Sequence, residues 1–152
     1  MKRTQCVEGK VELNLKGIQK KEIKLFTSGI RVVVERVNKP GICPNCGTPS
    51  DRIYEYRKQI ILDKPKSNKR IEIELNKRRF ICVNHKCPVK TFTERIEGLV
   101  SGKRYTQAFE NFLKDLVMRE GYISARNILE EKYNLCLSLT TLFYLDCHKR
   151  QL

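Results

Sequence analysis

The sequence predicts an α+β fold in which a β-rich N-terminal segment and a four-cysteine ribbon precede a C-terminal three-helix unit. Three observations support this prediction. Apolar and polar residues alternate with the period of half-buried strands through much of residues 6–81. Two close pairs of cysteines stand at the ends of residues 43–87. From Thr106 onward the apolar period changes from two to about 3.6 residues, which indicates amphipathic helices. The predicted segments are 1–42, 43–97 and 98–152.

The N-terminal segment contains three runs that alternate in strand fashion or are rich in β-branched residues, namely 7–15, 21–26 and 30–37. The sequence Thr27-Ser28-Gly29 predicts a turn between the last two runs. Residues 38–41, which contain proline and glycine, end the segment. We expect a small β-layer that packs on the ribbon.

The two cysteine pairs have the spacings C-x2-C and C-x4-C, with 35 residues between them. Gly47 follows the first pair and Pro88 follows the second, so a tight turn is favoured at each. Two thiolates a few residues apart can bind one side of a tetrahedral Zn²⁺ ion, and a hairpin can return the second pair to the other side. Such a closed site leaves no position for water, so the ion would be structural. The predicted ligands are Cys43, Cys46, Cys82 and Cys87.

Two alternatives stay open for these residues. His85 lies within the second pair and could replace Cys82 or Cys87 as a ligand, or it is a polar residue of the turn. The four cysteines could also be reduced core residues, which the nearby glycine and proline disfavour. A reducing cytosol is expected because the cysteine count is odd, at seven, and because the N-terminus lacks a signal peptide.

The chain between the cysteine pairs predicts a long hairpin. Residues 52–63 and 70–81 have strand character, and residues 64–69 form a basic turn. In the second strand the apolar positions share one face and the charged positions share the other. The apolar positions are Ile71, Ile73 and Leu75, and the charged ones are Arg70, Glu72 and Glu74. After the second pair, we expect Phe92 to pack over the ribbon and Glu94 to pair with Arg95 or a neighbour.

The formal net charge is +14, from 31 basic and 17 acidic residues. Residues 96–152 contribute 8 basic and 7 acidic residues, so nearly all of the excess lies before them. A basic surface of this size favours a polyanion such as nucleic acid, although it could also serve only solubility. The run Lys77-Arg78-Arg79 leads directly into Cys82, where it could grip phosphate or form the solvated end of a strand.

The C-terminal segment predicts three short helices after a linker at residues 98–102. Thr106, Ser124 and Ser138 are suitable N-caps for the three, and Gly121 is suited to end the first. This pattern favours a helix-turn-helix, although another three-helix bundle would show the same periodicity. The apolar stripes are Phe109, Phe112, Leu113, Leu116 and Val117; then Ala125, Ile128, Leu129 and Tyr133; then Leu139, Leu142, Phe143 and Cys147.

The run from Arg78 to Arg95 resembles part of a known family of mobile-element proteins. It is similar to the end of the zinc ribbon in insertion-sequence transposases of the ISL-three type, which reads R-R-F-x-C-x-N-x-x-C-x-x-x-T-F-x-E-R. The matching positions are Arg78, Arg79, Phe80, Cys82, Asn84, Cys87, Thr91, Phe92, Glu94 and Arg95. Arg104-Tyr105-Thr106 is similar to the start of the family's next helix, and the likeness extends from about Cys43 to the C-terminus.

The resemblance implies a zinc ribbon followed by a helix-turn-helix that finds the ends of a DNA element. In the family a catalytic RNase-H-like domain follows, and we expect its acidic metal site to be absent from this chain. The implied function is recognition of double-stranded DNA, such as element terminal repeats, without strand transfer. A zinc-ribbon module for RNA or protein is the alternative. The expected DNA contacts are Lys77, Arg78, Arg79, Lys103, Arg104, Thr140, Thr141, Tyr144 and His148.

The third helix departs from this expectation, because its start, Ser138-Leu139-Thr140-Thr141-Leu142, contains no charged residue. Base-specific readout by this helix is therefore in doubt. No apolar run reaches membrane-spanning length, so no membrane partner is expected. We expect a cytoplasmic protein associated with the bacterial nucleoid, with a second copy or a full-length transposase as protein partners.

Overall fold

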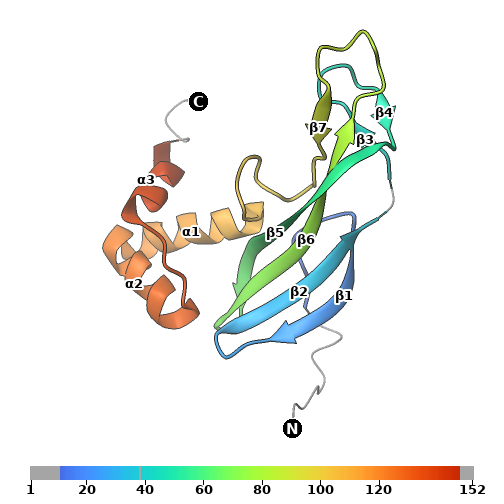
Figure 1. The fold of residues 1–152 in the computed structure, drawn as a ribbon. Helices are drawn as coiled ribbons and strands as arrows, with labels where there is room; N and C mark the ends of the chain where they lie inside the picture. Colours follow the sequence, from blue (N-terminus) through green and yellow to red (C-terminus); the bar gives the residue numbers. More distant parts are fainter. Residues whose placement is uncertain (1–10, 38, 148–152) are drawn as a thin grey trace.

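The structure is a computed structural model, and it describes residues 11–37 and 39–147. It has a mixed α+β architecture, with the strands in the N-terminal part and three helices after them (Figure 1). The α+β class predicted from the sequence is confirmed. The strands are β1 (Ile18–Leu25), β2 (Gly29–Arg36), β3 (Gly41–Ile42), β4 (Pro49–Ser50), β5 (Ile53–Lys66), β6 (Lys69–Ile81) and β7 (Thr91–Thr93). The helices are α1 (Gln107–Glu120), α2 (Tyr122–Tyr133) and α3 (Leu139–Cys147).

The main sheet has the strand order β1-β2-β6-β5, and β7 pairs with the far end of β6. β2 runs parallel to β6, whereas the β1–β2, β5–β6 and β6–β7 pairs are antiparallel. β3 and β4 form a separate two-stranded sheet beside the cysteines. Strands from the predicted segments 1–42 and 43–97 therefore share one sheet, through the β2–β6 pair.

The turn of the long hairpin is shorter than the predicted residues 64–69. β5 continues to Lys66 and β6 begins at Lys69, which leaves a two-residue loop. Both loop residues have positive φ angles, 51° at Ser67 and 60° at Asn68. A two-residue turn with positive φ at both residues matches the twist of the flanking strands. Strand pairing can therefore continue into residues 64–69, whose composition predicts a turn.

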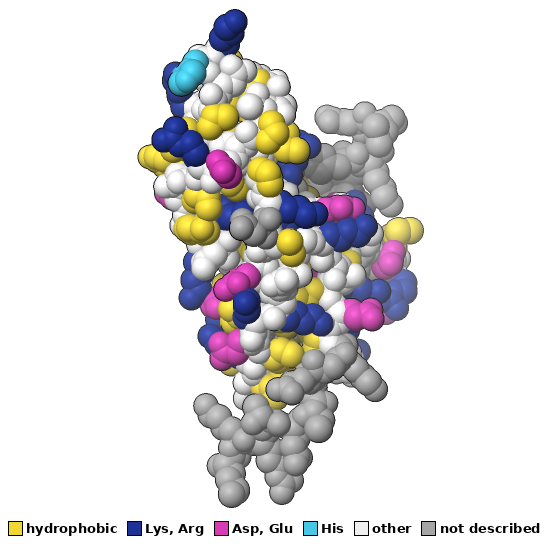
Figure 2. Space-filling view, turned by 90° about the vertical axis from the view of Figure 1, so that its right-hand side faces the viewer, with side chains coloured by type: hydrophobic (Ala, Val, Ile, Leu, Met, Phe, Trp, Pro, Cys, Tyr) yellow, Lys and Arg dark blue, Asp and Glu magenta, His cyan; other side chains and the backbone are white. Residues whose placement is uncertain are grey.

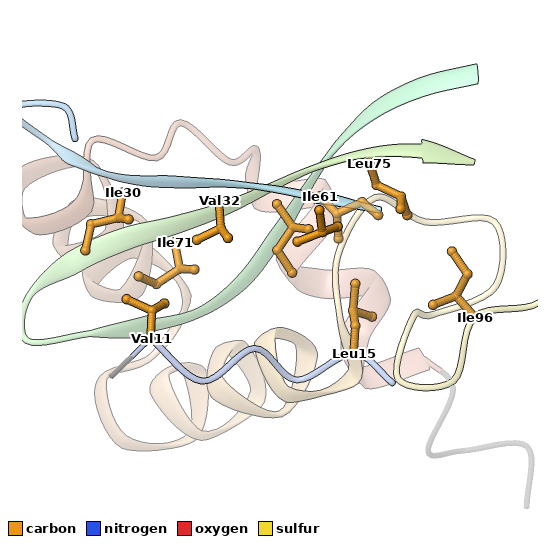
Figure 3. Packing of buried hydrophobic residues seen from close by; sticks show 10 residues of the cluster. Val11, Leu15, Ile30, Val32, Ile61, Ile71, Leu75 and Ile96 are labelled. Atoms are coloured by element: carbon orange, nitrogen blue, oxygen red, sulfur yellow. The ribbon is translucent and has the colours of Figure 1, made fainter. Parts of the chain in front are cut away.

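The predicted strand at residues 7–15 is corrected where the structure describes it. Residues 7–10 lie outside the described residues, and residues 11–15 belong to no strand and bend at Asn14. The alternation nevertheless reports burial, because Val11 and Leu15 are 5% and 6% exposed and point into the core (Figure 3). The segment covers the sheet with side chains and does not add to its edge.

The main core lies on one face of the sheet, between the strands and the segments around Val11 and Ile96. Burial of each large aliphatic side chain stabilises the fold by roughly 1.5–3 kcal/mol. On the opposite face of β6, Glu72 pairs with Arg31 and Arg70, and Glu74 pairs with Lys58. The predicted alternation along this strand is thus confirmed. The core residues are Val11, Leu15, Ile30, Val32, Val34, Ile61, Ile71, Ile73, Leu75 and Ile96.

Two of the three predicted helix caps are confirmed. The Thr106 hydroxyl accepts from the backbone N–H of Phe109, and the Ser138 hydroxyl accepts from that of Thr141. Ser124, however, lies inside α2. Gly121 adopts a φ of 79° and its carbonyl accepts the N–H of Ala125, so one glycine ends α1 and starts α2 without a loop.

The helices pack around a second core, which includes Phe109, Leu113, Leu129 and Leu142. The stripe predicted for the third helix needs one change, because Leu145 is buried whereas Phe143 is 47% exposed. The Phe143 ring lies against that of Tyr122, with centroids 4.4 Å apart. No helix within residues 11–37 and 39–147 is long and apolar enough to cross a membrane.

The sheet and the helices are joined at Asp63, a carboxylate that is 1% exposed. Its oxygens accept from the backbone and side-chain N–H groups of Asn14 at 2.9 and 3.0 Å, and from the Thr106 hydroxyl at 2.7 Å. The backbone N–H of Lys64 donates to it at 2.8 Å. The predicted linker is therefore held in place, and the Leu62 backbone also bonds to residues on both sides of Tyr105.

We predict that Asp63→Ala lowers the free energy of unfolding by about 3 kcal/mol, because buried donors lose their acceptor. Urea unfolding followed by circular dichroism measures the change. Asp51→Ala removes an exposed carboxylate and is the matched control, with an expected change of about 0.5 kcal/mol or less. Equal stability of the two variants would contradict the role of Asp63 as the joint.

Candidate metal centre and nucleic-acid interface

The first cysteine pair lies in a tight turn between β3 and β4. The N–H of Cys43 donates to the carbonyl of Thr48 at 3.1 Å, and the N–H of Gly47 donates back to the carbonyl of Cys43 at 2.9 Å. Gly47 has a φ of 72°, which a side chain would strain. These bonds turn the Sγ atoms of Cys43 and Cys46 toward the second pair.

The second pair follows the end of β6 directly. The N–H of Cys82 donates to the carbonyl of Lys90 at 2.9 Å, which closes the loop between β6 and β7. Within the loop, the N–H of Cys87 donates to the Asn84 carbonyl, and the Asn84 side chain accepts the N–H of Lys86. Asn84 therefore fixes the loop from both its backbone and its side chain.

The four Sγ atoms lie within 4.8 Å of one another. The Cys43–Cys87 distance is 3.9 Å and the Cys46–Cys82 distance is 3.6 Å. A tetrahedron with Zn–S bonds of about 2.3 Å has edges of about 3.8 Å, so the sulfurs fit one Zn²⁺ ion. His85 is exposed and is not part of this group, which leaves the cysteines as the donors.

Two polar side chains contact sulfur atoms of the cluster. The amide of Asn45 donates to Cys87 Sγ at 3.3 Å, and the hydroxyl of Thr48 lies 3.3 Å from Cys46 Sγ. Hydrogen bonding with Thr48 lowers the pKa of Cys46 to about 6. The backbone hydrogen bond at Asn84 lowers the pKa of Cys82, which faces Cys46, but burial and the bonds to the other thiols outweigh it and raise this pKa. With four thiolates the centre offers no open coordination position, so the ion it holds is structural.

An aromatic pair connects the metal centre to the sheet. Phe80 and Phe92 are register partners on β6 and β7, and their rings stack with centroids 5.7 Å apart. Both are buried with Cys43 and Cys87, which confirms the predicted packing of Phe92 over the ribbon. A Cβ at Gly41 would lie 2.4 Å from the Phe80 ring, so glycine is required for this close approach.

The structure corrects the prediction for Arg78. Its side chain is 8% exposed, and its guanidinium donates to Glu94 Oε2 from Nη2 at 2.9 Å and from Nε at 3.2 Å. The guanidinium also lies over the Phe80 ring. Arg78 shares the Phe80 face of β6, so it is turned inward and is not available to phosphate.

The other two residues of the basic run are only partly accessible. Lys77 is half-buried, and burial lowers its pKa even though the charge of Glu94 acts in the opposite direction. Arg79 pairs with Glu55 at 3.3 Å and lies over the ring of Tyr54. The structure therefore gives Arg79 a local partner and leaves Lys77 only partly accessible.

The remaining predicted contacts lie on two other elements. Lys103 and Arg104 are exposed in the loop before α1. On α3, Tyr144 is 64% exposed, Thr140 is exposed and Thr141 is half-buried beside its capping serine. His148 lies outside the described residues. The predicted contacts are thus spread over β6, a loop and α3.

Sequence reasoning missed Arg36 as a partner of Glu94. Arg36 Nε donates to Glu94 Oε2 at 3.1 Å, and its Nη1 donates to the carbonyls of Lys16 and Gly17. The network links β2, β6, the chain after β7 and the N-terminal segment. Burial raises the pKa of Glu94, but the bonds from Arg78 and the charge of Arg36 outweigh it and hold this pKa below its ordinary value.

We predict that Glu94→Gln lowers the free energy of unfolding at pH 7 by about 3 kcal/mol, because two buried guanidinium groups lose their counter-charge. A lowered folded-state pKa gives stability that is present above the unfolded-state pKa and is lost as the pH falls through the folded-state value. The difference between wild type and variant should therefore narrow below about pH 4. A difference that stays constant from pH 7 to pH 3 would exclude an ionised Glu94.

We predict that Cys82→Ser loses the bound zinc and unfolds the turns around the metal, because metal binding and folding are coupled in such sites. Atomic absorption gives the zinc content, and thermal unfolding gives the stability. Cys136→Ser, which removes an exposed thiol outside the cluster, should keep one zinc per chain. Retention of zinc by the Cys82 variant would contradict the ligand assignment.

A protein-family model matches residues 39–87, up to the fourth cysteine. The matching family model is described as the zinc-finger of transposase IS204/IS1001/IS1096/IS1165. No curated protein and no solved structure matches the chain. The matched region contains all four clustered sulfurs. Residues 39–87 are therefore similar to the zinc ribbon of these transposases, and Cys43, Cys46, Cys82 and Cys87 form a structural Zn²⁺ site.

Proposed function

We propose that this protein binds double-stranded DNA, such as the terminal repeats of an insertion element, and has no strand-transfer activity of its own. The observation that carries the proposal is the zinc ribbon, which matches a transposase family and has the sulfur geometry of a metal site. In the proposed mechanism, lysine and arginine side chains dock on phosphates and a helix enters the major groove.

The distribution of charge supports a polyanionic partner. Lys and Arg side chains occur from one end of the molecule to the other in the view of Figure 2, with Asp and Glu side chains among them. The chain carries a formal charge of +14, which favours fast association with a polyanion at low salt. Phosphate contacts of this kind position a protein on a duplex but do not read its sequence.

The helices support the proposal through their order and the exposure of α3. Five residues, 134–138, connect α2 to α3, and the Ser138 cap fixes where α3 begins. Thr140 and Tyr144 are exposed and one turn apart, so they can face a groove together. We propose that α1–α3 act as a helix-turn-helix with α3 as the recognition helix.

The composition of α3 limits what it can contribute. Leu139–Cys147 contains no lysine or arginine, so α3 offers hydroxyl and aromatic groups to bases without cations for phosphates. Cations elsewhere must then supply most of the affinity. A second copy or a full-length transposase would be the protein partner of such a unit on an element end.

We predict that the zinc-loaded protein binds a duplex carrying the element ends at least tenfold more tightly than random duplex or RNA of equal length. Fluorescence anisotropy at several salt concentrations measures the affinities, because the electrostatic part is meaningful only at stated salt. Equal binding to RNA and to random duplex would favour the alternative of an RNA- or protein-interaction module. Incubation with Mg²⁺ and labelled ends tests strand transfer, which we expect to be absent.

A further inference from the structure

The tip of the β5–β6 hairpin is an unusually basic turn. Residues 64–70 contain four cations and no acidic residue. Arg70 is paired with Glu72, but no ion pair within 4.0 Å involves Lys64, Lys66 or Lys69 in the described part of the chain. These three lysines, which we call the tip lysines, therefore have no acidic partner within ion-pair distance, and Lys64 and Lys69 are exposed whereas Lys66 is half-buried.

The register of the hairpin adds a second observation. Lys66 and Lys69 are direct partners across the two strands. Like charges at directly opposite positions of a sheet destabilise it. The two-residue turn itself requires residues that tolerate positive φ, which Ser67 and Asn68 supply, and it does not require lysine on either side. The fold alone thus gives no reason for the pair.

The tip is also held firmly beside the helices. Arg70 Nη1 donates to the carbonyl of Asn134, the residue that ends α2, at 2.8 Å. The Arg70 N–H is bonded to the carbonyl of Ser28 in the β1–β2 turn. At the base of the tip, Asp63 is bonded to the cap of α1. Figure 1 shows the end of the hairpin next to the end of α2, where the connection to α3 begins.

We infer that the tip lysines form a phosphate-binding surface for the backbone of the same duplex that α3 contacts. The inference rests on the proposed function and deepens it, because α3 lacks cations and the tip has an excess of them. Each ammonium is a compact charge on a flexible stem, which suits backbone contact without sequence reading. The rigid attachment through Asn134 and Asp63 sets the position of these charges relative to the helices.

The chemistry of the tip favours a nucleic-acid backbone over a lipid surface. Residues 64–70 contain no aromatic or large aliphatic side chain that would enter a bilayer. Leu25, which ends β1, and Phe26, which follows it in the neighbouring turn, are about half exposed, so binding to anionic vesicles is the competing outcome that the experiment must test. The pairing of Lys66 with Lys69 suits closely spaced phosphates of a duplex.

The test is the triple variant Lys64→Gln, Lys66→Gln and Lys69→Gln in the full chain loaded with zinc. We expect its affinity for duplex DNA to fall by roughly tenfold or more near 0.1 M salt, and its log K against log[salt] slope to weaken by about two to three. The matched control is Lys39→Gln, Lys86→Gln and Lys90→Gln, which removes three exposed lysines near the metal centre. The control should keep the slope within about one unit.

The outcomes separate the two proposals. If the wild-type protein does not bind duplex DNA, the proposed function and this inference fail together. If the wild type binds and the tip variant keeps the wild-type slope, or if both triple variants weaken it equally, only the inference fails. The inference would also be overturned if the tip variant no longer sedimented with phosphatidylserine vesicles but bound DNA as the wild type does. An unchanged thermal midpoint shows that the tip variant is folded.

Discussion

The register of β6 is the constraint on which the rest of the structure depends. This strand pairs with β2, β5 and β7, which are all the described strands of the main sheet except β1. A shift by one residue would turn Ile71, Ile73 and Leu75 away from the core and move Cys82 away from its partners. The hydrophobic core and the metal centre therefore require the same register, and each stabilises the other.

The buried charges of Arg78, Glu94 and Arg36 also restrict the strand pairing, as the hydrophobic core does. Arg78 and Glu94 are both nearly buried, and Arg36 joins them from β2. A buried ion pair is a poor source of net stability, but the loss of one partner is costly, so such a network disfavours alternative pairings. The basic character of the chain consequently serves two purposes. Some arginines hold strands together, whereas the tip lysines have no acidic partner in the described chain.

Local patterns in the sequence predicted the class of fold, the metal ligands, two helix caps and the faces of β6. These features depend on residues that are close in sequence or on fixed ligand spacing. The parallel β2–β6 pair and the joint at Asp63 could not be predicted, because they bring together residues far apart in the chain. Arg78 was mistaken for a surface residue because charge was counted without side-chain direction, although its spacing of two from Phe80 places both on one face.

Side-chain direction also decides which of the cations behind the formal charge of +14 can act on a partner. Ion pairs such as Arg31–Glu72 and Lys58–Glu74 occupy the middle of the sheet, and their fields largely cancel beyond about one Debye length. Lysines without an acidic partner in the described chain occur at both ends of the long hairpin, with Lys86 and Lys90 near the metal and the tip lysines at the other end. Of these two ends, the tip is hydrogen-bonded to the helices through Arg70. An electrostatic contact there would set the orientation of α3 as well as the affinity, and a contact at the metal end would have to act through the length of the sheet.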